Sequence, residues 1–199
     1  MLWYAHAAAL LLTITTGLLY LIDGLETDPW STRWIHVSAL IGAQCSDDPI
    51  RAFVAGLGNF GYGLSYVLLS IAFRQVYWRD RFVVKYIIGV IGLIALYLIL
   101  GFPSGKSIAT DIIHYSATGI ALFMLTFYAI LSTDRKKDPL SLIRDAAIIL
   151  MIVSVIGMFT AAVADEWDRR GWNTFVAFQI AYLANFVVFL LTWGTLIKH

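Results

Sequence analysis

The chain has 199 residues, of which 60% are hydrophobic and 14% charged, and its formal net charge is +1. An average soluble domain is roughly 45–50% apolar and about 25% charged. A soluble protein with this composition would expose large apolar patches. The same figures exclude a disordered chain, a coiled coil and a nucleic-acid-binding protein, and the single cysteine, Cys45, excludes a disulfide-stapled domain. The composition indicates an integral membrane protein.

Six apolar stretches are long enough to cross a membrane, because a hydrocarbon core about 30 Å thick needs roughly 20 residues of helix. They are residues 3–22, 53–73, 83–102, 112–132, 146–164 and 174–196. They lack the alternation of a membrane barrel, and helices satisfy their own backbone groups in lipid. No linker divides the chain. We therefore predict an all-α, polytopic membrane protein: a single domain over residues 1–199, built as a bundle of six transmembrane helices in three hairpins.

The charged residues predict the orientation of this bundle. Basic residues concentrate in the connections after the second and fourth stretches: Arg74, Arg79, Arg81, Lys85, Arg135, Lys136, Lys137 and Arg144. Acidic residues concentrate on the opposite side: Asp23, Glu26, Asp28, Asp47, Asp48, Asp111, Asp165, Glu166 and Asp168. Cytoplasmic loops carry the excess of Lys and Arg. We expect a multi-pass protein of the cell membrane with both termini in the cytoplasm.

The long outer connection before the second helix carries its own helix signal. Asp28 followed by Pro29 is typical of a helix start. Apolar residues then recur at helical spacing: Trp30, Trp34, Val37 and Ile41. Because indole rings favour the membrane interface, this pattern predicts a short interfacial helix in the first outer loop. The alternative is an ordinary loop packed over the helix ends.

The second helix is rich in small residues. Gly61 and Ser65 form a pair at four-residue spacing, which lets helix backbones approach closely in a membrane. Asn59 is the polar residue of this half of the helix, and its amide either bonds a neighbouring helix or contacts a ligand.

The fourth helix carries a polar stripe. Asp111, His114 and Thr118 share one helix face near the predicted outer end. A carboxylate three residues before a histidine could orient its ring and prepare it as a general base, which makes His114 and Asp111 the candidate catalytic residues. Equally, Asp111 could cap the helix and His114 could be a hydrogen-bonded packing residue.

Further polar residues fall near the same predicted outer side, and we expect them to line one ligand-binding cavity with Asn59 and Thr118. They are His36, Ser104, Asp165, Glu166, Gln179 and Asn185. The alternative is that they are solvated or bond neighbouring helices. The pattern predicts no metal site and identifies no cofactor.

Short motifs spread over nearly the whole chain resemble a known family. They are Ser38-Ala39-Leu40-Ile41-Gly42 in the first loop, Asn59-Phe60-Gly61, Gly101-Phe102-Pro103, and His114 followed by Gly119 and Phe123. The chain resembles the prokaryotic six-helix membrane family 998 of unknown function, which is similar to the Frag/DRAM/Sfk superfamily of eukaryotes. The resemblance implies lipid handling, with His114, Asn59 and Pro103 as matching positions. The acidic residue that the eukaryotic group often has near the start of the last helix has no clear match, because Glu166 lies earlier.

These observations lead to three functional hypotheses. The first is a protein that binds or handles a lipid or amphipathic small molecule in an outer-leaflet-facing cavity, with membrane lipids as its partners. The second is a structural or accessory subunit, which associates with other membrane proteins or with itself through the small-residue face of the second helix. The third is a lipid-modifying enzyme with His114 as base, Asp111 as its orienter and Ser104 or Cys45 as nucleophile.

Overall fold

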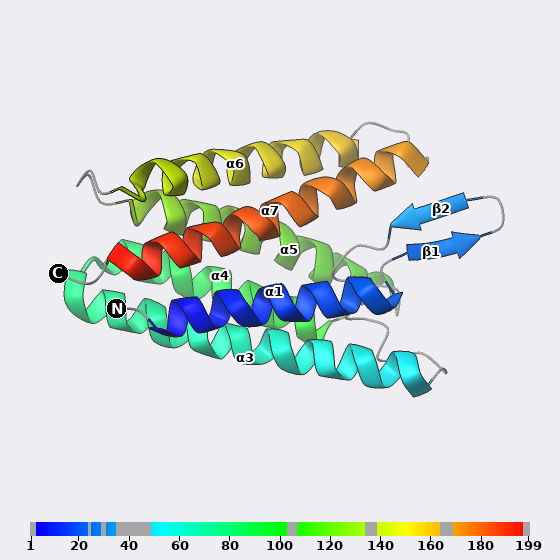
Figure 1. Ribbon diagram of the computed structural model, residues 1–199, viewed down its shortest axis with the longest axis horizontal. Coiled ribbons are helices and arrows are strands. Elements are labelled where there is room, and N and C mark those ends of the chain that lie inside the picture. Colours follow the sequence, from blue (N-terminus) through cyan, green and yellow to red (C-terminus); the bar gives the residue numbers. More distant parts are fainter. Residues whose placement is uncertain are drawn as a thin grey trace.

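The computed structural model describes residues 3–23, 25–28, 31–34, 49–102, 107–133, 139–163 and 169–196. Within them are six helices long and apolar enough to cross a membrane, which confirms the predicted fold class (Figure 1). The helices are α1 (Trp3–Asp23), α3 (Pro49–Asp80), α4 (Val83–Gly101), α5 (Ile108–Leu131), α6 (Ser141–Val163) and α7 (Arg169–Leu196).

The helices pack in the order of the sequence. The closest pairs are α1 with α3, α4 with α5, and α6 with α7, which are the three predicted hairpins. The hairpins meet through α3 and α4 and, more loosely, through α5 and α6, and α7 packs back against α1. The bundle is therefore a closed ring in which the first and last helices are neighbours, and both ends of the chain lie at the same end of it (Figure 1).

A cluster of aromatic side chains fills the ring at the end that carries the termini. The rings of Phe73 on α3 and Tyr128 on α5 stack with centroids 4.0 Å apart, and Trp193 on α7 packs edge-on against both. All three are buried. Gly89 on α4 faces this cluster, and a Cβ added there would approach the Phe73 ring to 2.8 Å. The absence of a side chain at residue 89 thus lets α4 approach the stacked rings.

The small residues of α3 serve the packing of α1. A Cβ at Gly58 would approach Leu19 to 2.8 Å, and one at Gly61 would collide with the side chain of Thr15. Ser65 is fully buried and its hydroxyl donates a hydrogen bond to the carbonyl of Gly61. Close backbone approach at small residues is a main source of helix association in lipid. This face of α3 is therefore covered by the first helix of the same chain.

Helix α5 begins earlier than the sequence pattern predicts, at Ile108, with Ser107 as its N-cap. The Thr110 amide donates to Ser107 Oγ at 3.2 Å, and the Ser107 amide donates to Thr110 Oγ1 at 2.9 Å. This is a capping box with threonine in the place usually taken by glutamate or glutamine. Asp111 therefore does not cap the helix, and that part of the alternative interpretation is wrong.

Four basic residues assigned to the inner loops lie inside helices: Arg74 and Arg79 in α3, Lys85 in α4 and Arg144 in α6. Lys85 is buried in the first turn of α4, and Arg144 is fully buried near the start of α6, which begins at Ser141. The predicted start at residue 146 was too late, because the prediction followed only the apolar run and the helix begins before that run. In the first turn of α6, Arg144 is buried while Leu142 and Ile143 beside it are exposed.

The outer loop differs from the prediction. Two short antiparallel strands, β1 (Leu25–Asp28) and β2 (Ser31–Trp34), form a hairpin at the end of the bundle opposite the termini (Figure 1). The interfacial helix is therefore wrong over residues 31–34, and the rest of the proposed helix lies outside the described residues. Thr27 pairs with Thr32 and Leu25 with Trp34. Threonine and tryptophan favour strands. Asp28 therefore lies in a strand and does not begin a helix.

Candidate functional site

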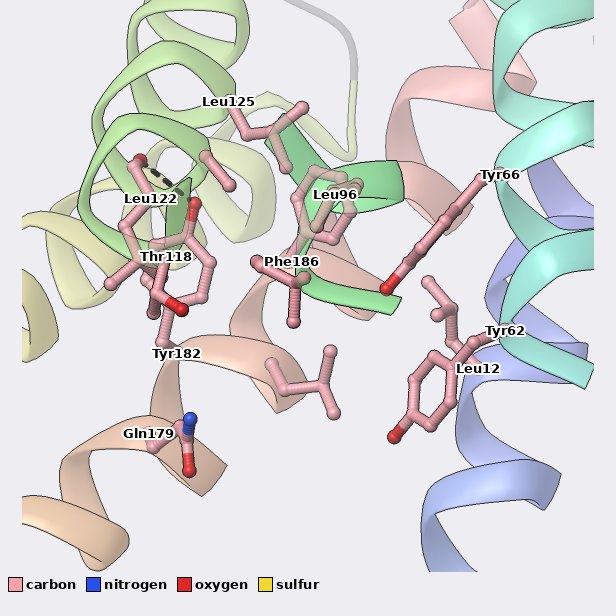
Figure 2. Close-up of a pocket in the computed structure, with 13 residues that line it drawn as sticks. Leu12, Tyr62, Tyr66, Leu96, Thr118, Leu122, Leu125, Gln179, Tyr182 and Phe186 are labelled. Atoms are coloured by element: carbon pink, nitrogen blue, oxygen red, sulfur yellow. Dashed lines mark hydrogen bonds between the residues drawn. The ribbon is translucent and has the colours of Figure 1, made fainter. Parts of the chain in front are cut away.

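A pocket of about 100 Å³ lies inside the ring near the middle of the helices (Figure 2). Its walls come from α1, α3, α4, α5 and α7, and no described residue of α6 lines it. The lining residues are Leu12, Tyr62, Tyr66, Leu96, Ile99, Thr118, Ala121, Leu122, Leu125, Gln179, Tyr182, Leu183 and Phe186. Most of these side chains are aliphatic or aromatic, so the pocket is suited to an apolar group.

A few polar groups are set into this apolar wall. Tyr62 and Tyr66 lie on one side of the pocket, and Thr118 and Gln179 lie across from them (Figure 2). The hydroxyl of Tyr66 points toward the pocket and has no hydrogen-bond partner among the described residues. Its ring packs edge-on against Tyr97 with centroids 5.7 Å apart, which fixes the direction of the hydroxyl. A bound molecule with one polar group could therefore pair with this hydroxyl.

The wall opposite Tyr66 is held by Tyr182. Its hydroxyl donates a hydrogen bond of 3.0 Å to the carbonyl of Leu122 on α5 (Figure 2). The same hydroxyl lies 3.2 Å from Thr126 Oγ1. These contacts join α7 to α5 across the ring. Since the Tyr182 hydroxyl is already engaged, it contributes its ring to the pocket rather than a free polar group.

The candidate catalytic pair does not form the predicted arrangement. His114 is fully buried, and its Nδ1 lies 2.8 Å from the carbonyl oxygen of Phe102, at the end of α4. Its Nε2 is buried and has no hydrogen-bond partner among the described residues. The ring is therefore oriented by a backbone carbonyl and not by Asp111, which is half-buried on the same helix. His114 does not line the pocket, although Thr118, one turn further on, does.

The other predicted ligand-binding residues separate into three groups. Thr118 and Gln179 line the pocket. Asn59 is half-buried on α3, and Asn185 donates from Nδ2 to the carbonyl of Ala181 on its own helix, but neither lines the pocket. The remaining residues, His36, Ser104, Asp165 and Glu166, lie outside the described residues, as does the candidate nucleophile Cys45. In the described ranges, no three His, Cys, Asp or Glu residues are grouped as metal ligands.

Sequence reasoning missed the tyrosines of the pocket. Tyr62 and Tyr66 are four residues apart and therefore share one face of α3, and both are buried. Tyrosines favour the membrane interface, so two tyrosines in the middle of a span are unusual. That position was the available signal of a role inside the bundle.

Comparisons with known protein families, with curated proteins and with solved structures find no match to this chain.

Proposed function

We propose that this membrane protein binds a lipid or another amphipathic small molecule inside its helical ring. The observation that carries the proposal is the pocket between α1, α3, α4, α5 and α7, with its apolar wall and the inward-pointing hydroxyl of Tyr66. A dry apolar cavity of about 150 Å³ accepts a small apolar molecule. A pocket of about 100 Å³ suits part of an acyl chain or a small ring rather than a whole lipid.

The two other hypotheses have less support. The accessory-subunit hypothesis uses the small-residue face of α3 as a docking surface, but Gly58 and Gly61 on that face pack against α1. The enzyme hypothesis needs a base that reaches a substrate, and His114 does not line the pocket. Lipid handling is also what the resemblance to family 998 implies.

The test is to fill the pocket and measure bound lipid. Ala121 is buried in the pocket wall, so Ala121→Phe occupies the space of a ligand. Ile149→Phe on the exposed face of α6 is the matched control. In native mass spectrometry of protein released from membranes, we expect a lipid-derived molecule on the wild type and the control, and occupancy lower by about tenfold or more in Ala121→Phe.

A gentler variant covers the case in which Ala121→Phe fails to fold. Tyr66→Phe removes one hydroxyl and no volume, and the loss of one hydrogen bond of about 0.5–1.5 kcal/mol weakens binding of a polar-headed ligand by about two- to tenfold. A wild-type protein without bound lipid, or wild-type occupancy in both variants, would contradict the proposal.

We also propose that the end carrying both termini faces the cytoplasm. The single cysteine, Cys45, belongs to the connection between Asp23 of α1 and Pro49 of α3, and these two helix ends lie opposite the termini (Figure 1). A membrane-impermeant maleimide added to intact cells should therefore label Cys45. It should not label a Cys45→Ser/Phe82→Cys variant, whose cysteine lies in the turn between α3 and α4. The reverse pattern would overturn this orientation.

A further inference from the structure

A groove of about 250 Å³ runs between α1 and α7 on the outside of the ring. Thr13 and Gly17 on α1 and Ala184 on α7 are exposed along it. Both helices are membrane spans, so the groove opens at the depth of the hydrocarbon. The molecules present at that depth are lipid tails.

This groove and the pocket share part of their lining. Leu12 and Leu183 line both spaces. A hydrogen bond of 2.6 Å also joins Thr16 Oγ1, in the groove, to the Tyr62 hydroxyl, at the pocket. Thr16 Oγ1 donates its own proton to the carbonyl of Leu12 at 2.7 Å. Tyr62 must therefore be the donor, since a hydroxyl has one proton.

We propose that one acyl chain of a bilayer lipid enters the pocket sideways through this groove, between the first and last helices. The boundary between groove and pocket includes two leucine side chains, which can change rotamer, and the Tyr62–Thr16 hydrogen bond, which must break for this boundary to open. The inference rests on the proposed function, because it names the ligand class and the route for the same pocket. The loosest seam of the ring, between α5 and α6, does not serve, because no described residue of α6 lines the pocket.

Gly17 gives a direct way to block the groove. A Cβ added there meets no atom within 4 Å, so Gly17→Leu extends into open space rather than into packed side chains. Gly56 on α3 is the matched control, since it is also exposed in a helix with no atom within 4 Å of an added Cβ. Both variants add the same side chain, and unfolding temperatures in detergent verify that both remain folded.

The probe is a phosphatidylcholine with a diazirine in one acyl chain, incorporated into nanodiscs with the purified protein. After brief illumination, peptide mass spectrometry locates the label. In the wild type we expect label on the groove faces of α1 and α7 and on pocket residues of α3 and α5. Gly17→Leu should reduce pocket labelling by about tenfold and Gly56→Leu should not. Label on the outer face of α6 should be equal in all three proteins.

A second variant tests the hydrogen bond between Tyr62 and Thr16. Tyr62→Phe keeps the ring and removes the bond to Thr16, so it should speed pocket labelling by about two- to tenfold over a time course. Pocket labelling that is present in the wild type and unchanged in Gly17→Leu would overturn the lateral route and leave the proposed function standing. No pocket labelling in the wild type, together with no bound lipid in native mass spectrometry, would overturn the proposed function itself.

Discussion

The Nε2 atom of His6 lies 2.9 Å from the carbonyl oxygen of Leu191, so a side chain of the first helix bonds the backbone of the last. A carbonyl oxygen can only accept, so Nε2 carries the proton of this bond. The contact lies near the N-terminal end of α1 and the C-terminal end of α7, where the ring closes. It holds the two helices together at one end, and the lateral groove lies further along the same seam.

Removing this bond should loosen α1. We expect His6→Phe to cost about 0.5–1.5 kcal/mol, the usual contribution of one hydrogen bond, and to speed amide exchange in α1 more than in α4. Hydrogen–deuterium exchange of the protein in nanodiscs measures both regions at once. Tyr4→Phe, in the same turn, is the control and should leave exchange unchanged. Equal exchange of α1 in His6→Phe and the wild type would mean that the bond contributes nothing to ring closure.

Gly89 should be intolerant of a side chain. A Cβ at this position approaches Phe73 to 2.8 Å and Tyr128 to 3.0 Å, and these stacked, buried rings are also confined by Trp193. We expect Gly89→Ala to destabilise the protein by about 1–3 kcal/mol, because an overpacked core must shift.

Thermal unfolding in detergent tests this prediction with Gly119→Ala as the control. Gly119 is also inside a helix, but an added Cβ there meets no atom within 4 Å. Alanine also favours helix over glycine, so the control should be as stable as the wild type or slightly more stable. Equal stability of the two variants would show that α4 can move away from the ring pair at little cost.

The capping box at the start of α5 should contribute measurably to stability. Ser107→Ala removes the acceptor of the Thr110 amide, and losing an N-cap of this kind costs about 1 kcal/mol. Ser107→Asp should retain most of that stability, because aspartate is an equally good cap. Ser116→Ala, on the exposed face of the same helix, is the control for loss of a serine hydroxyl. Unfolding by denaturant in mixed micelles would distinguish these variants, and a neutral Ser107→Ala would contradict the role of the cap.

The tautomer of His114 can be predicted from its partner. Nδ1 faces the carbonyl of Phe102, which accepts only, so Nδ1 carries a proton. We expect the ¹⁵N chemical shifts of labelled His114 to show a protonated Nδ1. Because Asp111 does not orient the ring, Asp111→Asn should leave those shifts unchanged. An unprotonated Nδ1, or a large change of these shifts in Asp111→Asn, would contradict this prediction. It would favour orientation of the His114 ring by Asp111, as the sequence spacing indicates.

The sequence predicts the membrane spans well because each span is a local property. An apolar run of sufficient length must form a helix in lipid, whatever the rest of the chain does. The ends of the helices are less predictable. The starts at Ser141 and Ile108 depend on a buried Arg144 and on a cap with an uncommon partner, and neither is an apolar signal. Strands β1 and β2 form by pairing with each other, which helical spacing does not indicate.

The candidate site was harder to predict for a related reason. Thr118 and Gln179 could be identified because they are polar residues inside apolar spans, and both line the pocket. Tyr62 and Tyr66 were missed because whether a tyrosine faces lipid or the interior depends on which helix lies beside it. The same limit applies to His114, since its partner Phe102 follows the end of α4, and no spacing within α5 indicates that contact.

Closure of the ring by the first and last helices has a consequence for biosynthesis. The helices leave the ribosome in sequence order, so the first hairpins can pair early, but the seam between α1 and α7 cannot form before α7 is inserted. Until then the apolar interior is open to the surrounding bilayer along one side. Insertion of α7 is therefore the step that separates the interior of the ring from the surrounding bilayer.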